Sequence, residues 1–496
     1  MAHVVRGKVR SEGALSTSGG VHALVTAPDG KTVYGVAGHD RGCGILFRWT
    51  AEKGVEQMGL VPEAKAENGR TVAIYRPTCL AVSPDGHRLA VGGADEVAGV
   101  AVLTLPETDV PPVETLAEMK SRYEAELYDS LVPFWETHAV DPKYGDLFTC
   151  LDREGAVYDT FKHVWREWRG CYTFTMLYNG PRHETRWLAR AEAIAAFLRA
   201  KTRAADGSYP FLIDRDGKAL KTGGGEAVFT HAFAAIACAE LYKATGKDEY
   251  KDEAESCWRV YRRLAAENDR PYRQLAHRMI AINVLNVFNR VFADAYAKEV
   301  ATIIAELPCF REDEHGCLFE RLTADGAADL GTQYGRFISP GHNLEGVSFA
   351  LDAVRRSGDR SQLGFLLGLA DAAWDFGWDR EGGGGIVYRD AKGLPSWKNE
   401  WMLKNYWSCC EAATGMLRAY ELTGERKYLD RFREIDAWSW RNFRDTEYGG
   451  WYQYAPVDGR RAHTYKGGMG IGFFHVPRYL FECIELFGRI GEKCVK

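Results

Sequence analysis

The sequence predicts a mainly helical protein, an (α/α)6 toroid of six helical hairpins preceded by a small all-β region. Residues 21–50 and 77–105 alternate apolar runs with Pro-Asp-Gly turns, whereas long amphipathic helical patterns dominate after about Thr115. Helical segments also end in similar glycine-containing breakers at regular spacing. We therefore expect a propeller-blade-like β region over residues 1–110 and a helical domain over residues 111–496.

In the N-terminal region, turns at Pro28-Asp29-Gly30 and Pro84-Asp85-Gly86 lie 56 residues apart. Each joins two apolar segments, and its glycine supplies the positive φ that a hairpin turn needs. The pattern resembles two blades of a β-propeller, which cannot close a ring on their own. We expect the blades to pack against the next domain or to pair with a second copy of the chain. The acidic, proline-rich residues 105–118 are predicted to form the linker.

The helical domain is built from segments with apolar residues at helical spacing. The clearest are residues 186–200, 229–245 and 408–422. The breakers contain Gly180, Gly246, Gly358 and Gly424, which are 66, 112 and 66 residues apart. If the middle spacing holds two periods, one period fits a helical hairpin, and the domain holds about six hairpins. Six hairpins that close on themselves make a toroid, although an open solenoid has the same periodicity.

Composition excludes several classes of function. Hydrophobic residues make up 46% of the 496 residues and charged residues 26%, as in ordinary globular proteins. The net charge of −5 gives no reason to expect nucleic acid as a partner, and no apolar run is long enough to span a membrane. The first residues lack a signal-peptide core, so we expect a cytoplasmic protein. The 12 cysteines show no metal-ligand spacing, which argues against zinc.

Two clusters place charged residues on helices. Arg169 lies near the start of an aromatic helical segment that includes Tyr172. An arginine on an apolar face is costly to bury unless it binds something. An exposed Arg–Glu ion pair is the alternative. A Pro-Gly pair places His342 in the first turn of another helix, with Glu345 on the same face to orient the imidazole. Glu345 could instead cap the helix.

Two further clusters lie closer to the C-terminus. Trp407 and Glu411 lie on adjacent helical turns and could hold a sugar, although helix packing is the simpler explanation. A run of glycines then leads to His475, which stands at a helix start among aromatic residues. Histidine titrates near neutrality and can carry a proton, but a lone histidine can also merely be satisfied at a helix start.

Two histidines and one arginine form a coherent set for sugar chemistry. Moving the proton at C2 of an open-chain aldose requires a base with a pKa near neutrality and a cation to hold the enolate oxygen. One base on one face gives aldose–ketose isomerisation, whereas two groups on opposite faces invert C2. Neither scheme needs a metal or an organic cofactor.

From about Tyr123 to Leu486 the chain resembles the N-acylglucosamine 2-epimerase family, which includes renin-binding proteins, cellobiose 2-epimerases and mannose isomerases. The segments that carry the resemblance are VWREWRGCYTFTMLY (164–178), SPGHNLEG (339–346), FGWDREGGGGIVYRDAKG (376–393), WMLKNYWSCCEA (401–412), FRDTEYGGWYQY (443–454) and KGGMGIGFFHVPR (466–478). The resemblance implies an (α/α)6 barrel and favours a homodimer.

The resemblance also implies roles for individual residues. His342 and His475 match the acid/base pair of the family, and Arg169 matches its essential arginine. Glu345 matches the glutamate that supports the first histidine, and Arg336 matches a substrate-binding arginine. The residues that we expect to bind the sugar are Glu345, Arg336, Trp407, Tyr172 and Glu411. The implied activity is a cofactor-independent 2-epimerase of the N-acylglucosamine/N-acylmannosamine type, with a mannose-type aldose–ketose isomerase as the alternative.

Two positions depart from the family pattern. Ile471 and Phe474 stand where the N-acylglucosamine branch usually has a lysine and a cysteine, which leaves the identity of the sugar open. A second hypothesis is a glycan hydrolase or lyase, which would need paired carboxylates drawn from Asp379, Glu381 and Glu411. A third is a non-catalytic interaction protein that binds a partner through the blades.

Overall fold

The structure is a computed structural model. It describes residues 2–5, 8–11, 20–28, 30–37, 44–51, 54–61, 64–65, 71–72, 74, 77–84, 88–93, 99–104, 114–224, 226–380, 382–456 and 461–494. The chain divides into two compact units. The first comprises Met1–Met119, Trp378–Gly384 and Thr423–Arg441, and the second comprises Lys120–Gly377, Gly385–Leu422 and Asn442–Lys496. The domain boundary at residue 110 stays a prediction.

Antiparallel strands form the N-terminal part of the first unit, which confirms the small β region. One sheet has the order β3 (Val21–Thr26), β4 (Val33–Ala37), β5 (Ile45–Thr50), β6 (Gly54–Leu60). A second has the order β11 (Gly99–Thr104), β10 (Arg88–Gly93), β9 (Pro77–Val82). Two short pairs are β1 (Ala2–Val5) with β2 (Lys8–Ser11), and β7 (Ala64–Lys65) with β8 (Thr71–Val72).

The two larger sheets share one apolar core. It consists of Ala27, Tyr34, Val36, Leu46, Leu89, Val91 and Leu103. The predicted hairpins are present, because β3 pairs with β4 and β9 pairs with β10 in antiparallel register. Asp29, residues 85–87 and residues 105–113 of the predicted linker lie outside the described residues.

Helices dominate the rest of the chain, as the sequence predicts. They are α1 (Leu116–Ala125), the π-helix η2 (Glu126–Leu131), α2 (Val132–His138), α3 (Val164–Asn179), α4 (Thr185–Lys201), α5 (Ala227–Thr245), α6 (Asp248–Asn268), α7 (Leu275–Val291), α8 (Ala297–Glu306), α9 (Pro340–Ser357), α10 (Leu363–Gly377), α11 (Tyr406–Thr423), α12 (Arg426–Phe443) and α13 (His475–Cys494), with the short 3-10 helices η3 (Leu307–Phe310) and η4 (Asn399–Met402). The helices predicted at 186–200, 229–245 and 408–422 coincide with α4, α5 and α11.

The predicted breakers end helices in two ways. Gly246, Gly358 and Gly424 follow α5, α9 and α11 with φ of 68°, 72° and 72°. This is the left-handed conformation that glycine adopts more readily than other residues at a helix C-terminus. Gly180 follows α3 with φ of −86° and an extended backbone, so it ends that helix without the left-handed turn.

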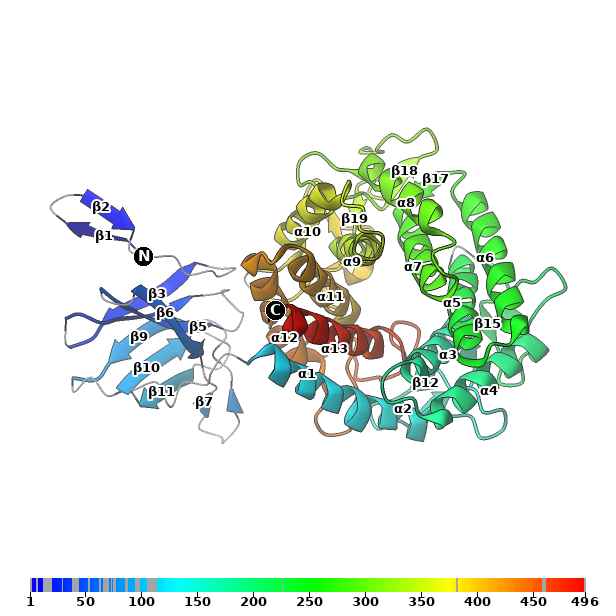
Figure 1. Ribbon diagram of the computed structural model, residues 1–496, viewed down its shortest axis with the longest axis horizontal. Coiled ribbons are helices and arrows are strands. Elements are labelled where there is room, and N and C mark those ends of the chain that lie inside the picture. Colours follow the sequence, from blue (N-terminus) through cyan, green and yellow to red (C-terminus); the bar gives the residue numbers. More distant parts are fainter. Residues whose placement is uncertain are drawn as a thin grey trace. The chain divides into compact units, whose positions relative to one another are not determined.

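Alternate helices of the second unit pack against each other in one continuous series, which runs through α3, α5, α7, α9, α11 and α13 (Figure 1). Contacts run from α3 to α5, from α5 to α7 and from α7 to α9. Arg418 of α11 donates to the Ser348 carbonyl of α9 at 2.7 Å, and Arg489 of α13 donates to Glu421 of α11 at 2.7 Å. Contacts of α13 with α3 bring the series back to its first helix.

Short antiparallel strands lie in the loops between the helices. They are β12 (Cys150–Leu151), β13 (Val157–Asp159), β14 (Lys162–His163), β15 (Leu212–Ile213), β16 (Ala219–Lys221), β17 (Tyr272–Gln274), β18 (Arg321–Thr323), β19 (Phe337–Ile338) and β20 (Arg389–Asp390). Strands β14, β17 and β19 run almost directly into α3, α7 and α9 and so fix where these helices begin. None of the helices that the structure describes has the length and apolar character that crossing a membrane requires.

Candidate active site

His342 lies in the first turn of α9, as the Pro-Gly pair predicts. The helix begins at Pro340, where the preset φ of proline suits the first helical position and no N–H is required. The Ser339 hydroxyl accepts a hydrogen bond from the His342 backbone N–H at 3.2 Å and caps the helix. The His342 side chain is 24% exposed, which leaves it accessible from a cavity.

His475 begins α13, directly after the glycine-rich loop. A buried ion pair holds the start of this loop, because Lys466 Nζ donates to Asp445 Oδ2 at 2.9 Å. A β-carbon at Gly470 would overlap the side-chain amide of Gln453, so the backbone can approach this side chain only with glycine at that position. The loop therefore fixes the place at which His475 enters the helix.

A cavity of about 810 Å³ in the second unit brings together residues from all six segments that carry the family resemblance. The predicted site residues that line it are Arg169, His342, Glu345, Trp407 and His475. They come from α3, α9, α11 and α13, so helices far apart in the sequence supply one pocket. The three predicted catalytic residues are all among them.

His475 is held as a neutral imidazole. Its Nδ1 lies 2.8 Å from Glu411 Oε1, and because a carboxylate only accepts, Nδ1 carries the proton and Nε2 keeps its lone pair. Nε2 lies 3.5 Å from Arg169 Nη1. Burial, with the Arg169 charge, lowers the pKa of His475 to about 3, against the opposing effect of Glu411. At neutral pH the ring is therefore free to accept a proton at Nε2.

Arg169 is positioned by aromatic rings and not by a carboxylate. Its guanidinium carbon lies 3.9 Å from the ring centre of Phe233, 4.5 Å from that of Trp165 and 4.6 Å from that of Phe474. No ion pair within 4 Å involves Arg169 in the part of the chain that the structure describes. Burial lowers its pKa, but an arginine stays cationic at neutral pH. Its charge remains available to an oxyanion.

His342 has the opposite electrostatic environment. Its Nδ1 lies 3.0 Å from Glu320 Oε2 and donates to it. Burial acts to lower the pKa of His342, but the Glu320 carboxylate outweighs this effect and raises it above the ordinary value. Glu345, the expected partner of the imidazole, is not its hydrogen-bond partner, although its charge also acts to raise the His342 pKa. It faces α13 instead, where its Oε1 lies 3.5 Å from Arg478 Nη2.

Trp407 lies next to both imidazoles. Its ring centre is 5.2 Å from that of His342 and 6.1 Å from that of His475, with interplanar angles of 35° and 37°. One indole therefore contacts both candidate proton carriers and restricts how their rings can turn.

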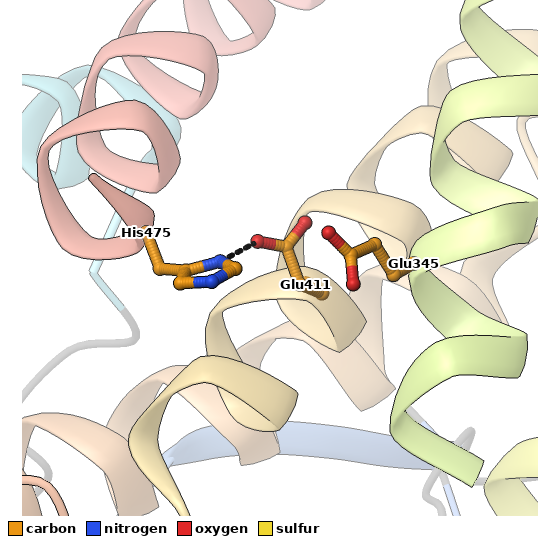
Figure 2. A group of neighbouring side chains, drawn as sticks. All are labelled: Glu345, Glu411 and His475. Carbon is orange, nitrogen blue, oxygen red and sulfur yellow. Dashed lines mark hydrogen bonds and ion pairs between the residues drawn. The ribbon is translucent and has the colours of Figure 1, made fainter. Parts of the chain in front are cut away.

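Glu345, Glu411 and His475 form a buried cluster with the donor types of a metal site (Figure 2). Figure 2 shows the Glu411 carboxylate between the other two side chains. Arg478 donates to Glu411 and lies 3.5 Å from Glu345, so a guanidinium already lies against both carboxylates. Burial acts to raise the pKa of Glu411, but Arg478 and His475 hold it below its usual range. A divalent cation here would meet a fixed positive charge, and the cluster does not suit a metal.

Three predicted substrate-binding residues are not among those that line the cavity. Tyr172 is buried with its ring centre 5.7 Å from that of Phe474. Arg336 is engaged by Asp390, with Nε 3.0 Å from Oδ2. Glu411 lies behind His475 and acts on it through the hydrogen bond to Nδ1.

Four further side chains line the cavity or contact a residue that lines it, and none of them is in the predicted site. Arg478 belongs to the His-Val-Pro-Arg motif and Arg166 to the tryptophan–arginine motif, so both could have been selected by their motifs. Glu320 and Arg321 line the cavity from the start of β18, in the loop between η3 and α9. No local pattern distinguishes these two, because their roles depend on tertiary contacts: Glu320 bonds to His342, and Arg321 packs on Tyr334.

Of the carboxylates proposed for a hydrolase, the two that the structure describes do not form a pair across the cavity. Asp379 is not among the lining residues. Glu411 is buried and bonded to His475 and Arg478, and Glu381 lies outside the described residues. A glycosidase needs an acid and a second carboxylate that flank the scissile bond.

Comparison with known proteins gives consistent relatives. Residues 147–477 match the family described as N-acylglucosamine 2-epimerase (GlcNAc 2-epimerase). The chain is 32% identical over 399 residues to N-acylglucosamine 2-epimerase of Mus musculus, with 77% of this chain and 94% of that protein covered. It is 33% identical over 136 residues to D-mannose isomerase of Pseudomonas cannabina pv. alisalensis, with 26% of this chain and 30% of that protein covered.

Solved structures share the fold over about three quarters of the chain. Cellobiose 2-epimerase from Bacillus thermoamylovorans B4167 superposes with a TM-score of 0.64 at 18% identity, covering 74% of this chain and 99% of that one. A D-mannose isomerase superposes with a TM-score of 0.66 at 19% identity, covering 74% and 98%. The family match spans more than half of this chain, and a relative of more than 30% identity covers most of it. The chain therefore belongs to the N-acylglucosamine 2-epimerase family.

Proposed function

We propose that the protein is a cofactor-independent sugar 2-epimerase that interconverts N-acylglucosamine and N-acylmannosamine. The observation that carries the proposal is a pair of histidines on one cavity with opposite protonation preferences. Each ring is fixed through Nδ1 by its own carboxylate, so each has Nε2 available for chemistry. Pairs of groups whose environments move their pKa values apart are typical of acid/base partners. The family to which the chain belongs supports the same reaction.

In the proposed reaction His475 is the base for one epimer. Its neutral Nε2 takes the proton from C2 of the open-chain sugar, and the electron pair of the broken C–H bond moves onto the C1 oxygen. Arg169 lies next to Nε2 and carries no ion pair, so its guanidinium stabilises the enolate oxygen. The new negative charge on the sugar also offsets the cation that disfavours an imidazolium at His475.

His342 then completes the inversion. Glu320 keeps this imidazole protonated, and its Nε2 delivers a proton to the other face of C2 while the C1 carbonyl re-forms. The opposite epimer uses the two histidines in exchanged roles. Trp407 keeps both rings in place, and Glu411 fixes the tautomer of His475.

Aldose–ketose isomerisation is the second candidate, favoured by the similarity to a D-mannose isomerase over residues that cover 26% of this chain. It would use one histidine twice, removing the proton at C2 and returning it at C1. Its product is a ketose and not a 2-epimer, so one spectrum distinguishes the two reactions.

We also propose the number of helical hairpins, the oligomeric state and the location of the protein. The series of helix contacts from α3 through α13 and back supports six hairpins in an (α/α)6 toroid, with residues 111–496 as the catalytic domain. The two larger β-sheets of the N-terminal region are too few to close a propeller. Pairing with the sheets of a second copy would complete them, which supports a homodimer. Buried cysteine thiols such as Cys171 and Cys410 support a reducing, cytoplasmic location.

The test is proton NMR in heavy water with N-acetylglucosamine, N-acetylmannosamine, glucose, mannose and cellobiose. Wild-type protein is expected to place deuterium at C2 and to form the 2-epimer of an N-acetyl sugar. His342→Asn is expected to lose inversion by about 10³-fold or more, while His475 still exchanges the C2 proton of one epimer. His475→Asn should exchange only the other epimer. Wild-type inversion rates in either variant would refute the two-histidine mechanism.

A further inference from the structure

A second guanidinium, that of Arg321, lines the cavity on the His342 side. Arg321 follows Glu320, the residue that holds His342, and its charge acts to lower the His342 pKa. Its guanidinium carbon lies 3.8 Å from the ring centre of Tyr334, which also lines the cavity. An aromatic face thus positions Arg321 in the same manner as aromatic rings position Arg169.

The guanidinium of Arg321 is incompletely satisfied. Its Nε and Nη1 are buried and find no hydrogen-bond partner in the regions that the structure describes, and no ion pair within 4 Å is formed there. Buried donors of a charged group that lack an acceptor are costly, and the cost is removed when a ligand supplies the acceptor. Arg321 is therefore set to receive an oxygen atom from the bound sugar.

Gln274 stands directly opposite Arg321 and offers the complementary group. The antiparallel register of β17 and β18 pairs these two residues, which places their side chains on the same face with β-carbons about 4.5–5.5 Å apart. Gln274 Nε2 donates to the Asn268 carbonyl at 3.3 Å, so its Oε1 is the atom left for a ligand donor. Both side chains line the cavity. A hydrogen-bond donor and an acceptor therefore lie side by side.

The surface next to this pair is apolar. Ala276, Met279 and Ile280, in the first turns of α7 that follow Gln274, line the same cavity, as does Phe337. This surface can cover a methyl or other small alkyl group, at about 25 cal/mol for each Å² removed from water.

We propose that Arg321, Gln274 and the apolar start of α7 form the subsite for the N-acyl group of the sugar; this inference rests on the proposed 2-epimerase function. The acyl carbonyl accepts from Arg321, the amide N–H donates to Gln274 Oε1, and the alkyl group contacts the apolar residues. The subsite explains how the chain recognises an N-acyl sugar although Ile471 and Phe474 depart from the pattern of that branch.

Other substituents fit this surface less well. A carboxylate or phosphate would satisfy Arg321, but it would lie near Glu320, whose Oε1 is buried without a hydrogen-bond partner among the described residues. It would also leave Gln274 Oε1 without a donor. A hydroxyl group could bind either side chain, but it brings no alkyl group for the apolar surface. Only an amide supplies an acceptor, a donor and an apolar end together.

The test measures binding of an open-chain pair that cannot react, N-acetylglucosaminitol and glucitol, by isothermal titration calorimetry. Wild-type protein is expected to bind N-acetylglucosaminitol at least about 10-fold more tightly. Arg321→Met should weaken that ligand about 10- to 100-fold, the range for a hydrogen bond from a charged group, and leave glucitol within about 3-fold. Gln274→Leu should have a smaller effect in the same direction, and Arg321→Lys should be intermediate because it keeps the charge but not the fork.

Arg273→Met is the matched control. Arg273 lies beside Gln274 on β17, pairs with Leu322 and is not among the residues that line the cavity. It should change neither affinity. Equal weakening of both ligands by Arg321→Met would overturn the acyl subsite and make Arg321 a general hydroxyl-binding residue, and no change in either ligand would overturn it as well. Melting temperatures identify a misfolded variant, in which case Arg321→Lys decides.

The same proteins distinguish this inference from the proposed function. Suppose that the wild-type protein epimerises no sugar, but that Arg321→Met loses the preference for N-acetylglucosaminitol over glucitol. That result would support the subsite and refute the 2-epimerase. Epimerisation of N-acetylmannosamine at an unchanged kcat/KM in Arg321→Met would refute the subsite and retain the 2-epimerase.

Discussion

Glu320→Gln tests whether the protonation of His342 depends on one carboxylate. The substitution keeps the shape of the side chain and an oxygen that can accept from Nδ1, but it removes the negative charge. Burial and the nearby Arg321 both act to lower the pKa of His342, and only carboxylates oppose them. Without the Glu320 charge, the imidazole is expected to become neutral at a lower pH.

The size of the effect follows from the geometry. Glu320 Oε2 lies 3.0 Å from His342 Nδ1, so the two charges are centred about 4 Å apart. At an effective dielectric constant of 20, unit charges at that separation interact by about 4 kcal/mol. Even half of this energy changes a protonation equilibrium by more than a factor of 10, since about 1.4 kcal/mol corresponds to tenfold.

The assay is the pH dependence of kcat/KM for epimerisation of an N-acetyl sugar in the direction that uses His342 as the acid. The acid must be protonated, so activity falls as the pH rises through the pKa of His342. In Glu320→Gln this fall is expected at least one pH unit lower than in wild type, with activity at pH 8 reduced by about 10-fold or more and activity near pH 5 largely kept. An unchanged alkaline limb in a folded variant would refute the assignment of His342 as the acid held by Glu320.

Three further predictions concern the surroundings of the site. Arg336→Met should lower the free energy of unfolding by about 3 kcal/mol, because Asp390 is left buried without its partner. KM should stay within about 3-fold of wild type. A large rise in KM would show instead that Arg336 binds the substrate. Gly470→Ala should lower kcat/KM by about 10-fold with little change in melting temperature, because the new β-carbon forces Gln453 to move at the cavity wall; full activity would show that the wall tolerates the shift. Prolonged dialysis against EDTA should leave the epimerisation rate unchanged, because the guanidinium of Arg478 already pairs with Glu411 in the carboxylate cluster, and loss of activity restored by a divalent cation would contradict this interpretation.

The sequence predicted the parts of the site that local patterns encode. A Pro-Gly pair and a serine cap place His342 in a first helical turn whatever the rest of the chain does, and the glycine run ends at His475 for a similar reason. Periodicity was sufficient to locate α4, α5 and α11.

The side chains that tune the histidines could not be found in this way. Glu345 is on the same helix face as His342 in sequence terms, yet it faces α13 and Arg478. Glu320 reaches the imidazole instead from the preceding loop, directly before β18. Arg336 carries a charge within a motif, but the choice between a sugar and Asp390 as its partner depends on how two distant strands, β19 and β20, pair. These contacts are tertiary, and no periodicity in one segment records them.

Under the proposed mechanism, the unequal protonation preferences of the two imidazoles leave the free enzyme in a form that depends on which epimer reacted last. Under the proposed mechanism each turnover leaves the proton on the opposite ring, so the free enzyme exists in two isomeric forms, each able to accept only one configuration at C2. Glu320 favours the form with its proton on His342, and the form with the proton on His475 must relax through proton exchange with water before the same epimer can react again. At high flux in that direction the relaxation becomes the slow step, and an isotopically labelled pool of one epimer is driven away from equilibrium when an excess of the unlabelled other epimer is added.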